Sequence, residues 1–513
     1  MRTKSSFLNM AAAWGGQVVA LLIQLIVRMV FVQYLSNEYL GLSGLFSNIL
    51  SMLSLVELGV GPAMTFSLYK PLAEHDTEKV KSLMRLYQIT YRAIGAIILM
   101  LGVVTIPIYP YLINGKPDIP YLNLIYFLFV FNTGVSYFYS YKRSLISSDQ
   151  KRYVETLTHY LFYFLYNLAQ IIVLVLTQNY ILFLVCQVAS TVLENFTLSK
   201  MADKMYPYLK EKDIAPLPRE DVAMIKRNVG AMVFHKVGTI VVNGTDNILI
   251  TKFIGLAVTG LYSNYTIVIN ALKLIVSQVF KSITASVGNL SAVESEKKIT
   301  EVFYKTLFAN FWIYGFCAIC LECLFQPFIA IWLGERFLLD QFTVTMLVLS
   351  FFFAGMRQAV LTFRDATATY YYDRYKPLFE SVVNLVASIV LVQSMGIAGI
   401  FLGTIISTLT VCTWVEPYVL YEYVLKCSLK GYFQKYLLYC FVTLIAGLIT
   451  YGLTSLPQGN IYLVFVVRCI ICAIIPNLIF IAVFHRTKEF LYFKNMLTSL
   501  VVKVLKLHGI HKM

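Results

Sequence analysis

The first apolar run of the chain covers residues 8–33 and reads LNMAAAWGGQVVALLIQLIVRMVFVQ. A helix of this length crosses the roughly 30 Å hydrocarbon core of a bilayer, because each residue adds about 1.5 Å of rise. Similar runs recur to the end of the chain. The predicted membrane spans are 8–33, 42–68, 90–112, 121–141, 157–177, 180–199, 231–253, 258–282, 306–333, 342–363, 378–394, 396–417, 437–455 and 460–484. The sequence therefore predicts an all-α polytopic membrane protein with about 14 transmembrane helices.

The basic residues between these runs give the orientation. With the N-terminus on the cytoplasmic side, 33 of the 42 Lys and Arg fall on that side and only 3 fall on the outer side. Basic residues remain in the cytoplasm during insertion, so both termini are predicted to be cytoplasmic. The same distribution explains the net charge of +15 as membrane flanks and lipid contacts. A nucleic-acid-binding role is therefore not expected.

Enzymatic signatures are missing from the sequence. It contains no GxxxxGK[ST], HExxH or GxSxG pattern, and the predicted outer loops are too short for a catalytic domain. Cys317, Cys320 and Cys323 have a CxxCxxC spacing, but inside a membrane helix cysteine serves as a small apolar residue. We therefore expect neither an enzyme nor a bound metal or cofactor.

A short motif occurs twice at an offset of 216 residues. It reads GLFSN at 44–48 and GLYSN at 260–264, each time at the start of a predicted span that runs inward from a short outer loop. The repeat predicts two six-helix lobes of the same orientation, as in transporters built from parallel repeats. The predicted divisions are an N-terminal lobe 1–199, a cytoplasmic linker 200–230, a C-terminal lobe 231–418, two extra helices in 419–485 and a cytoplasmic amphipathic tail 486–513.

Charged residues inside membrane spans are costly and are functional candidates by default. The basic candidates for a central cavity are Arg28, Lys236, Lys273 and Arg357; the acidic residues weighed against them are Glu57, Asp246 and Glu322. An excess of cations would suit a phosphate or carboxylate group. The alternative is a set of internal ion pairs, such as Arg28 with Glu57 or Lys273 with Asp246.

Two further features bear on mechanism. Asp246, which lies in an unusually polar span, and Glu57 are candidate coupling residues for a proton or cation, or else structural pairing partners. Gly59, Gly61 and Pro62 are predicted to loosen or kink the second span, because proline lacks a backbone donor. That kink is a candidate hinge, and a static bend is the alternative.

The tail after Arg486 has its own pattern. Apolar residues recur there at helical spacing between lysines: Phe490, Phe493, Leu497, Leu500, Val501, Val504 and Leu505. The pattern predicts an interfacial amphipathic helix, with a solvated tail as the alternative.

Several stretches resemble bacterial lipid-linked oligosaccharide flippases of the MATE-like multidrug, oligosaccharidyl-lipid and polysaccharide exporter (MOP) superfamily. They are residues 39–50 (YLGLSGLFSNIL), 57–61 (ELGVG), 67–73 (SLYKPLA), 245–248 (TDNI), 260–265 (GLYSNY) and 399–404 (GIFLGT). The resemblance implies a flippase of the bacterial cytoplasmic membrane that moves a polyprenyl-diphosphate-linked oligosaccharide by alternating access, for surface polysaccharide biosynthesis. It also implies a cationic cavity, membrane lipids and a polysaccharide polymerase and export machinery as partners, and a possible H+ or Na+ gradient. A monomer suffices for this activity.

Three alternatives remain open. A cation-coupled drug exporter of the same superfamily would favour twelve spans and an acidic cavity. A membrane polysaccharide polymerase or ligase would require a larger outer loop. A flippase for the peptidoglycan precursor differs only in its substrate.

Overall fold

The computed structural model describes residues 2–57, 59–115, 117–211 and 213–507. Within these ranges, the side chains at 2–14, 226–228, 230–243, 285, 292, 370 and 500–507 lie outside the description. The described chain is helical and contains no strand. In a bilayer this is the expected outcome, because a helix satisfies its own backbone hydrogen bonds without water.

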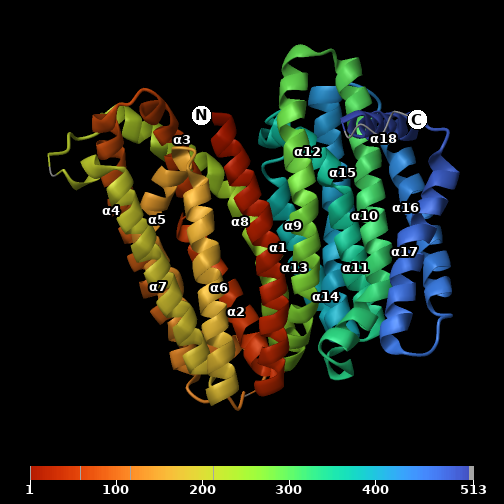
Figure 1. Ribbon diagram of the computed structural model, residues 1–513, viewed down its shortest axis with the longest axis horizontal. Coiled ribbons are helices and arrows are strands. Elements are labelled where there is room, and N and C mark those ends of the chain that lie inside the picture. The colour runs from red at the N-terminus through yellow and green to blue at the C-terminus, as the bar shows by residue number, and fades with distance from the viewer. Residues whose placement is uncertain (1, 58, 116, 212, 508–513) are drawn as a thin grey trace. The chain divides into compact units, whose positions relative to one another are not determined.

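The chain divides into two compact units, Met1–Ser263 and Asn264–Met513. The first runs from red to yellow-green in Figure 1 and the second from green to blue. The helices of the first unit are α1 Arg2–Tyr34, α2 Asn37–Leu53, α3 Val60–Ala73, α4 Thr77–Val104, α5 Leu122–Ser148, α6 Arg152–Thr177, α7 Tyr180–Met205 and α8 Arg219–Phe253. Helix α9 (Leu256–Val293) begins in the first unit and continues into the second.

The second unit contains the remaining helices. They are α10 Glu296–Trp332, α11 Gln341–Met356, α12 Gln358–Ala366, α13 Lys376–Met395, α14 Ile397–Ser407, α15 Thr413–Leu420, α16 Lys430–Thr454, α17 Ile461–Phe484 and α18 Lys488–Leu507. Two π-helical segments, Thr408–Cys412 and Tyr421–Leu425, flank α15. Short 3-10 turns at Ser54–Glu57, Tyr109–Leu112, Pro207–Lys210, Glu335–Phe337 and Thr369–Tyr371 complete the chain.

Thirteen helical stretches of the described residues are long and apolar enough to cross a membrane. They confirm the all-α polytopic prediction. The predicted span that has no counterpart among them, 231–253, falls within α8, where most side chains lie outside the described part. Polar caps mark several helix starts at the predicted outer face; Asn179, Asp340 and Asn460 accept backbone hydrogen bonds from the first turns of α7, α11 and α17.

The boundary between the two units differs from the predicted lobe boundary at 200–230. Helix α8 packs on α2 and α3 of the first unit, where the Asn48 amide donates to the backbone oxygen of Gly244 at 3.0 Å. Residues 231–263 therefore belong to the first unit. Between the 3-10 turn Pro207–Lys210 and the start of α8 at Arg219, the described residues 211 and 213–218 are not helical.

The two helices beyond the predicted twelve pack directly on α10. The Phe311 ring stacks on Tyr439 of α16 at 4.3 Å between centroids, and Trp312 donates to Asn477 of α17 at 2.8 Å. Aromatic packing of this kind stabilises an interface beyond its buried area. Helices α16 and α17 are therefore an integral part of the second unit.

Candidate functional site

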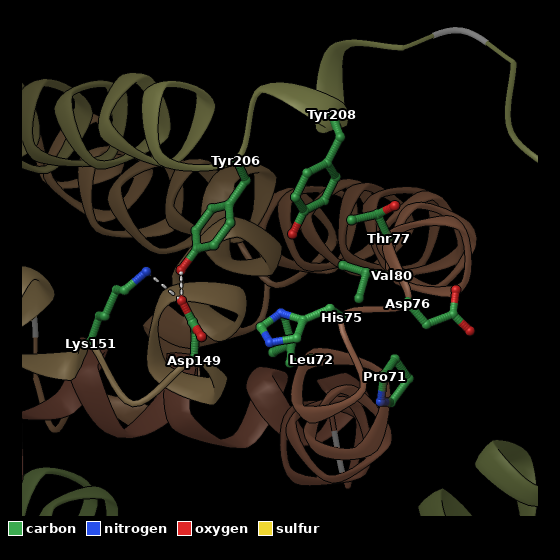
Figure 2. A pocket seen from close by; sticks show the side chains of 10 residues that line it. All are labelled: Pro71, Leu72, His75, Asp76, Thr77, Val80, Asp149, Lys151, Tyr206 and Tyr208. Carbon is green, nitrogen blue, oxygen red and sulfur yellow. Dashed lines mark hydrogen bonds and ion pairs between the residues drawn. The ribbon is translucent and has the colours of Figure 1, made fainter. Parts of the chain in front are cut away.

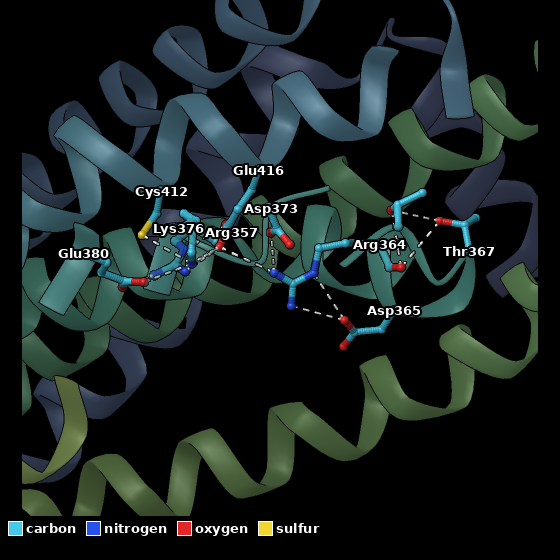
Figure 3. A network of polar contacts seen from close by, with 10 residues as sticks. Arg357, Arg364, Asp365, Thr367, Asp373, Lys376, Glu380, Cys412 and Glu416 are labelled. Carbon is cyan, nitrogen blue, oxygen red and sulfur yellow. Dashed lines mark hydrogen bonds and ion pairs between the residues drawn. The ribbon is translucent and has the colours of Figure 1, made fainter. Parts of the chain in front are cut away.

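The most extensive group of charges in the described chain lies inside the second unit (Figure 3). Arg357 stands at the junction of α11 and α12, and its guanidinium donates two hydrogen bonds to Glu416 of α15. The Nε–Oε2 distance is 3.0 Å and the Nη2–Oε1 distance is 2.6 Å. The Glu416 side chain has no solvent exposure. This two-point contact is the geometry in which arginine binds a carboxylate most strongly.

Other charges surround this pair. Lys376 Nζ lies 2.7 Å from Glu416 and 2.9 Å from Glu380, and Glu380 also accepts from Arg357 at 3.3 Å. At the edge of the group, Arg364 lies 2.9 Å from Asp373. Three cations thus meet three buried carboxylates, so the group is electrically balanced.

The local backbone explains how Glu416 reaches the interior of the unit. Helix α15 stands between the two π-helical segments, and the Thr413 hydroxyl donates to the backbone oxygen of Thr408 at 3.0 Å. A π turn inserts an extra residue into the helix and so rotates the following side chains, a device found often at functional positions. The insertion sets the face that Glu416 presents to Arg357.

This network changes the interpretation of Arg357. The sequence predicts it as a cavity cation, but its charge is balanced by Glu416 and Glu380 within its own unit. A buried pair of this kind cannot lose one partner without a large cost, so its first role is structural. Arg357 thus forms internal ion pairs, which was the alternative to a cavity cation. Its partners, Glu416 and Glu380, are not among the pairs considered from the sequence.

Arg28 has a different environment in the first unit. Its Nη1 donates to the Ser263 hydroxyl at 2.9 Å, and the structure gives it no carboxylate partner among the described residues. Arg28 lies six residues before the end of α1, so it is nearer to the predicted outer end than to the middle of the helix. The guanidinium keeps donors that this single contact does not use.

Glu57 does not pair with Arg28. Its two carboxylate oxygens accept from the tyrosine hydroxyls of Tyr137 at 2.9 Å and Tyr91 at 3.4 Å. The Arg28–Glu57 ion pair considered from the sequence is therefore wrong for this structure. Arg28 contacts a serine hydroxyl and Glu57 contacts two tyrosine hydroxyls, so the hydrogen-bond partners of both are uncharged.

Helices α2 and α9 approach each other closely at two glycines: Gly41, three residues before the repeated motif in α2, and Gly260, the first residue of the motif in α9. A Cβ atom on Gly41 would stand 2.1 Å from the backbone oxygen of Leu256, and one on Gly260 would stand 2.0 Å from that of Asn37. Only glycine permits such an approach of two backbones. The predicted outer ends of these two helices are thus in direct contact.

The predicted kink in the second span is confirmed. Helix α2 ends at Leu53, a 3-10 turn covers Ser54–Glu57, and α3 begins at Val60 after Gly59 in the left-handed conformation with φ 77°. Gly61 and Pro62 follow in the first turn of α3, where proline has no helical donor to lose. Whether the break acts as a hinge stays a prediction.

The other predicted residues occupy separate places. Lys273 lies in the part of α9 that belongs to the second unit, with an exposed side chain. Asp246 lies in α8, two residues after the backbone oxygen that accepts from Asn48. The side chain of Lys236, in the same helix, falls outside the described residues. Their roles in binding or coupling stay predictions.

A cavity of about 250 Å³ opens at the predicted cytoplasmic end of the first unit (Figure 2). Several of its polar groups are engaged: Asp149 accepts from Tyr206 at 2.8 Å and pairs with Lys151 at 2.6 Å, while Asp76 caps α4. Burial and the hydrogen bond to Asp149 raise the pKa of Tyr206, so its phenol stays protonated and keeps donating. The Tyr206 hydrogen bond joins the residue after α7 to the turn between α5 and α6.

Sequence reasoning missed three buried acids, although each lies inside a predicted span: Glu194, Glu380 and Glu416. With them, the predicted spans contain six acidic residues, twice the number weighed in the sequence analysis. Glu194 pairs with Arg143, and His159 Nδ1 lies 3.2 Å from it. A complete count of acids within the spans would have found all three.

The fold is similar to that of several solved transporters. A lipid II flippase MurJ in an inward closed conformation matches with a TM-score of 0.64 and 14% identity, over 93% of this chain and 99% of that chain. An inward-facing multidrug resistance MATE family transporter of the MOP superfamily matches with a TM-score of 0.59 and 13% identity, over 78% of this chain and 94% of that chain. At these identities the likeness establishes a shared fold.

A mutant form of the Vibrio cholerae MATE transporter VcmN matches with a TM-score of 0.55 and 13% identity, over 83% of this chain and 99% of that chain. No family model and no curated protein matches the sequence. The chain therefore has the fold that MurJ and the MATE transporters share.

Proposed function

We propose that the chain is a flippase that moves a polyprenyl-diphosphate-linked oligosaccharide across the bacterial cytoplasmic membrane for surface polysaccharide biosynthesis. The observation that carries this proposal is Arg28, a cation in a membrane helix whose described contact is a hydroxyl instead of a carboxylate. The MurJ-like fold is consistent with it.

Arg28 is suited to bind a diphosphate. Arg28 lies within a membrane span, six residues before the end of α1, and an intramembrane arginine is costly and is retained where a site requires the charge. Guanidinium donors match phosphate oxygens in two-point contacts. With Ser263 holding one nitrogen at 2.9 Å, the remaining donors are free to contact an anionic head group.

The extent of the structural match supports a lipid flippase over a drug exporter. The MurJ structure matches 93% of this chain, whereas the two MATE structures match 78% and 83%. The chain also has α16 and α17, which pack on α10 through Phe311 and Trp312. A polyprenyl tail would remain in the lipid while a hydrated path carries the diphosphate and sugars, which cannot cross hydrocarbon unaided.

The contact between Gly41 and Leu256 and between Gly260 and Asn37 supports alternating access. It holds the predicted outer ends of α2 and α9 together, as a closed outer gate requires. Opening that gate would separate them, and the break before Gly59 supplies a point at which α3 can move relative to α2. In this proposal Gly59, Gly61 and Pro62 form the hinge, and Asp246 is the residue that would respond to an H+ or Na+ gradient.

The test is the fate of lipid-linked oligosaccharide in a strain in which the gene is deleted. We expect polyprenyl-diphosphate oligosaccharide to accumulate in the inner leaflet and surface polysaccharide to be lost. Unchanged lipid intermediates and intact polysaccharide, together with a new sensitivity to cationic dyes, would overturn the proposal and favour drug export.

A further inference from the structure

Helix α18 (Lys488–Leu507) has a different direction from the rest of the second unit. Figure 1 shows it lying crosswise to α10, α16 and α17 at one end of that unit. The contacts of its first two turns place it beside the start of α10, on the face predicted to be cytoplasmic. The axis of α18 therefore runs across the spanning helices of the second unit instead of along them.

The first two turns of α18 are fixed to the transmembrane helices. Phe490 stacks on Trp312 at 5.9 Å between centroids and Phe493 stacks on Phe308 at 6.3 Å. Glu489 forms an ion pair with Lys435 of α16, and Lys305 lies 3.9 Å above the ring of Tyr492. These contacts fix the first two turns of α18 to α10 and α16 of the second unit.

The apolar stripe of α18 continues past the end of these contacts. At 3.6 residues per turn, Leu497 falls on the same face as Phe490 and Phe493, and its side chain is 59% exposed. By the same spacing the sequence places Leu500, Val501 and Val504 on this face. The stripe that packs on α10 at its start therefore continues along the sequence of α18 past its last described contact with α10, and its described residue Leu497 is exposed.

Basic residues occupy the rest of the helix. Lys488, Lys503 and Lys506 fall on the side opposite the stripe, and Lys494 flanks it. Glu489, the only acidic residue of α18, is already paired with Lys435. An apolar stripe with a basic opposite face is the composition of helices that bind anionic membrane surfaces.

We infer that α18 binds the surface of an anionic phospholipid membrane. Its first two turns anchor it to α10 and α16, and its second half inserts the stripe from Leu497 onward among the lipid head groups while the lysines contact lipid phosphates. This inference does not depend on the transported substrate, so it can hold or fail separately from the proposed flippase activity.

The test is hydrogen–deuterium exchange of the full-length protein in vesicles of phosphatidylcholine and in vesicles with added phosphatidylglycerol. We expect exchange of the amides of 497–507 to slow about tenfold when the anionic lipid is present, and the protection to fall as salt is added. Equal exchange in the two kinds of vesicle would overturn the inference. Protection that instead rises with protein density in the vesicles would also overturn it, because it would identify a second copy as the occupant of the stripe.

Substitutions test the contributions of the apolar stripe and of the basic face of α18 separately. Leu497→Glu and the double change Lys503→Gln with Lys506→Gln should each abolish the lipid-dependent protection. Lys297→Gln with Lys298→Gln removes the same charge from the N-terminus of α10 and should leave it intact. Slow exchange of 488–494 in every variant shows that the anchor has folded, and unchanged protection in Leu497→Glu would contradict the inference.

Discussion

The guanidinium of Arg357 contacts both carboxylate oxygens of Glu416, at 3.0 and 2.6 Å, inside the second unit. The contact joins the junction of α11 and α12 to α15, a short helix between two π-helical segments. Because Lys376 and Glu380 share the same group, each charge depends on the others for its neutralisation. Arg357 is therefore paired with carboxylates, whereas Arg28 has no acid beside it among the described residues.

The network makes a prediction about stability. Glu416→Gln should lower the free energy of unfolding by about 3–5 kcal/mol, because it leaves buried cations without their acid. Adding Arg357→Gln should recover much of this loss, since the remaining cations and acids then balance. The thermal unfolding midpoint of the purified protein in detergent measures both effects.

A surface ion pair supplies the control for this experiment. Lys426 lies 2.7 Å from Glu296, with side chains 60% and 52% exposed, so Lys426→Ala should cost less than about 1 kcal/mol. If the double variant proves less stable than Glu416→Gln alone, charge balance does not govern the network.

The contact at Gly260 makes a prediction about conformation. Gly260→Ala places a Cβ atom 2.0 Å from the backbone oxygen of Asn37, so the outer ends of α2 and α9 must separate. We expect faster labelling from outside of a cysteine introduced at the buried position Leu40, together with slower transport. Gly452→Ala, where a Cβ meets no atom within 4 Å, should leave both rates unchanged. Equal labelling in Gly260→Ala and Gly452→Ala would show that these outer ends do not form a gate.

The break between α2 and α3 predicts a second effect. Gly59 has φ 77°, and a left-handed backbone costs a residue with a side chain about 1–2 kcal/mol. Gly59→Ala should therefore destabilise the protein and slow transport. Gly288→Ala, near the end of α9, where a Cβ atom would meet only the backbone oxygen of Ala366 at 3.8 Å, should be neutral or stabilising. Transport by Gly59→Ala at the wild-type rate would reject the hinge and leave a static bend.

Asp246 has a prediction of its own. If it is the coupling residue, Asp246→Asn should keep the folded protein but remove the response of transport to an imposed ion gradient, because the amide cannot bind or release a proton. The transport rate measured with and without the gradient tests this. A variant that responds as the wild type does would exclude Asp246 from coupling.

Much of the fold could be predicted because membrane insertion acts on local composition. Apolar length locates the helices, and the glycines and proline at 59–62 locate the break between α2 and α3. The amphipathic spacing after Arg486 likewise predicts α18. In each of these cases a few neighbouring residues determine the local structure.

The partners of the buried charges could not be predicted in this way. Arg357 and Glu416 are 59 residues apart and meet only because α11 packs on α14 and a π turn reorients α15. Glu57 is satisfied by tyrosines of α4 and α5, which sequence spacing does not indicate. The unit boundary after Ser263 has the same origin, because it follows from the packing of α8 on α2.

Transport by purified protein in vesicles is the direct test of whether Arg28 binds the diphosphate head group. The measurement is the rate at which polyprenyl-diphosphate oligosaccharide reaches the leaflet exposed to an impermeant glycosidase. We expect Arg28→Gln to transport about tenfold or more slowly than wild type, because it loses a charged hydrogen bond, and Arg28→Lys to transport at an intermediate rate. Lys281→Gln, an exposed cation on α9, should transport at the wild-type rate. Wild-type transport by Arg28→Gln would contradict the account.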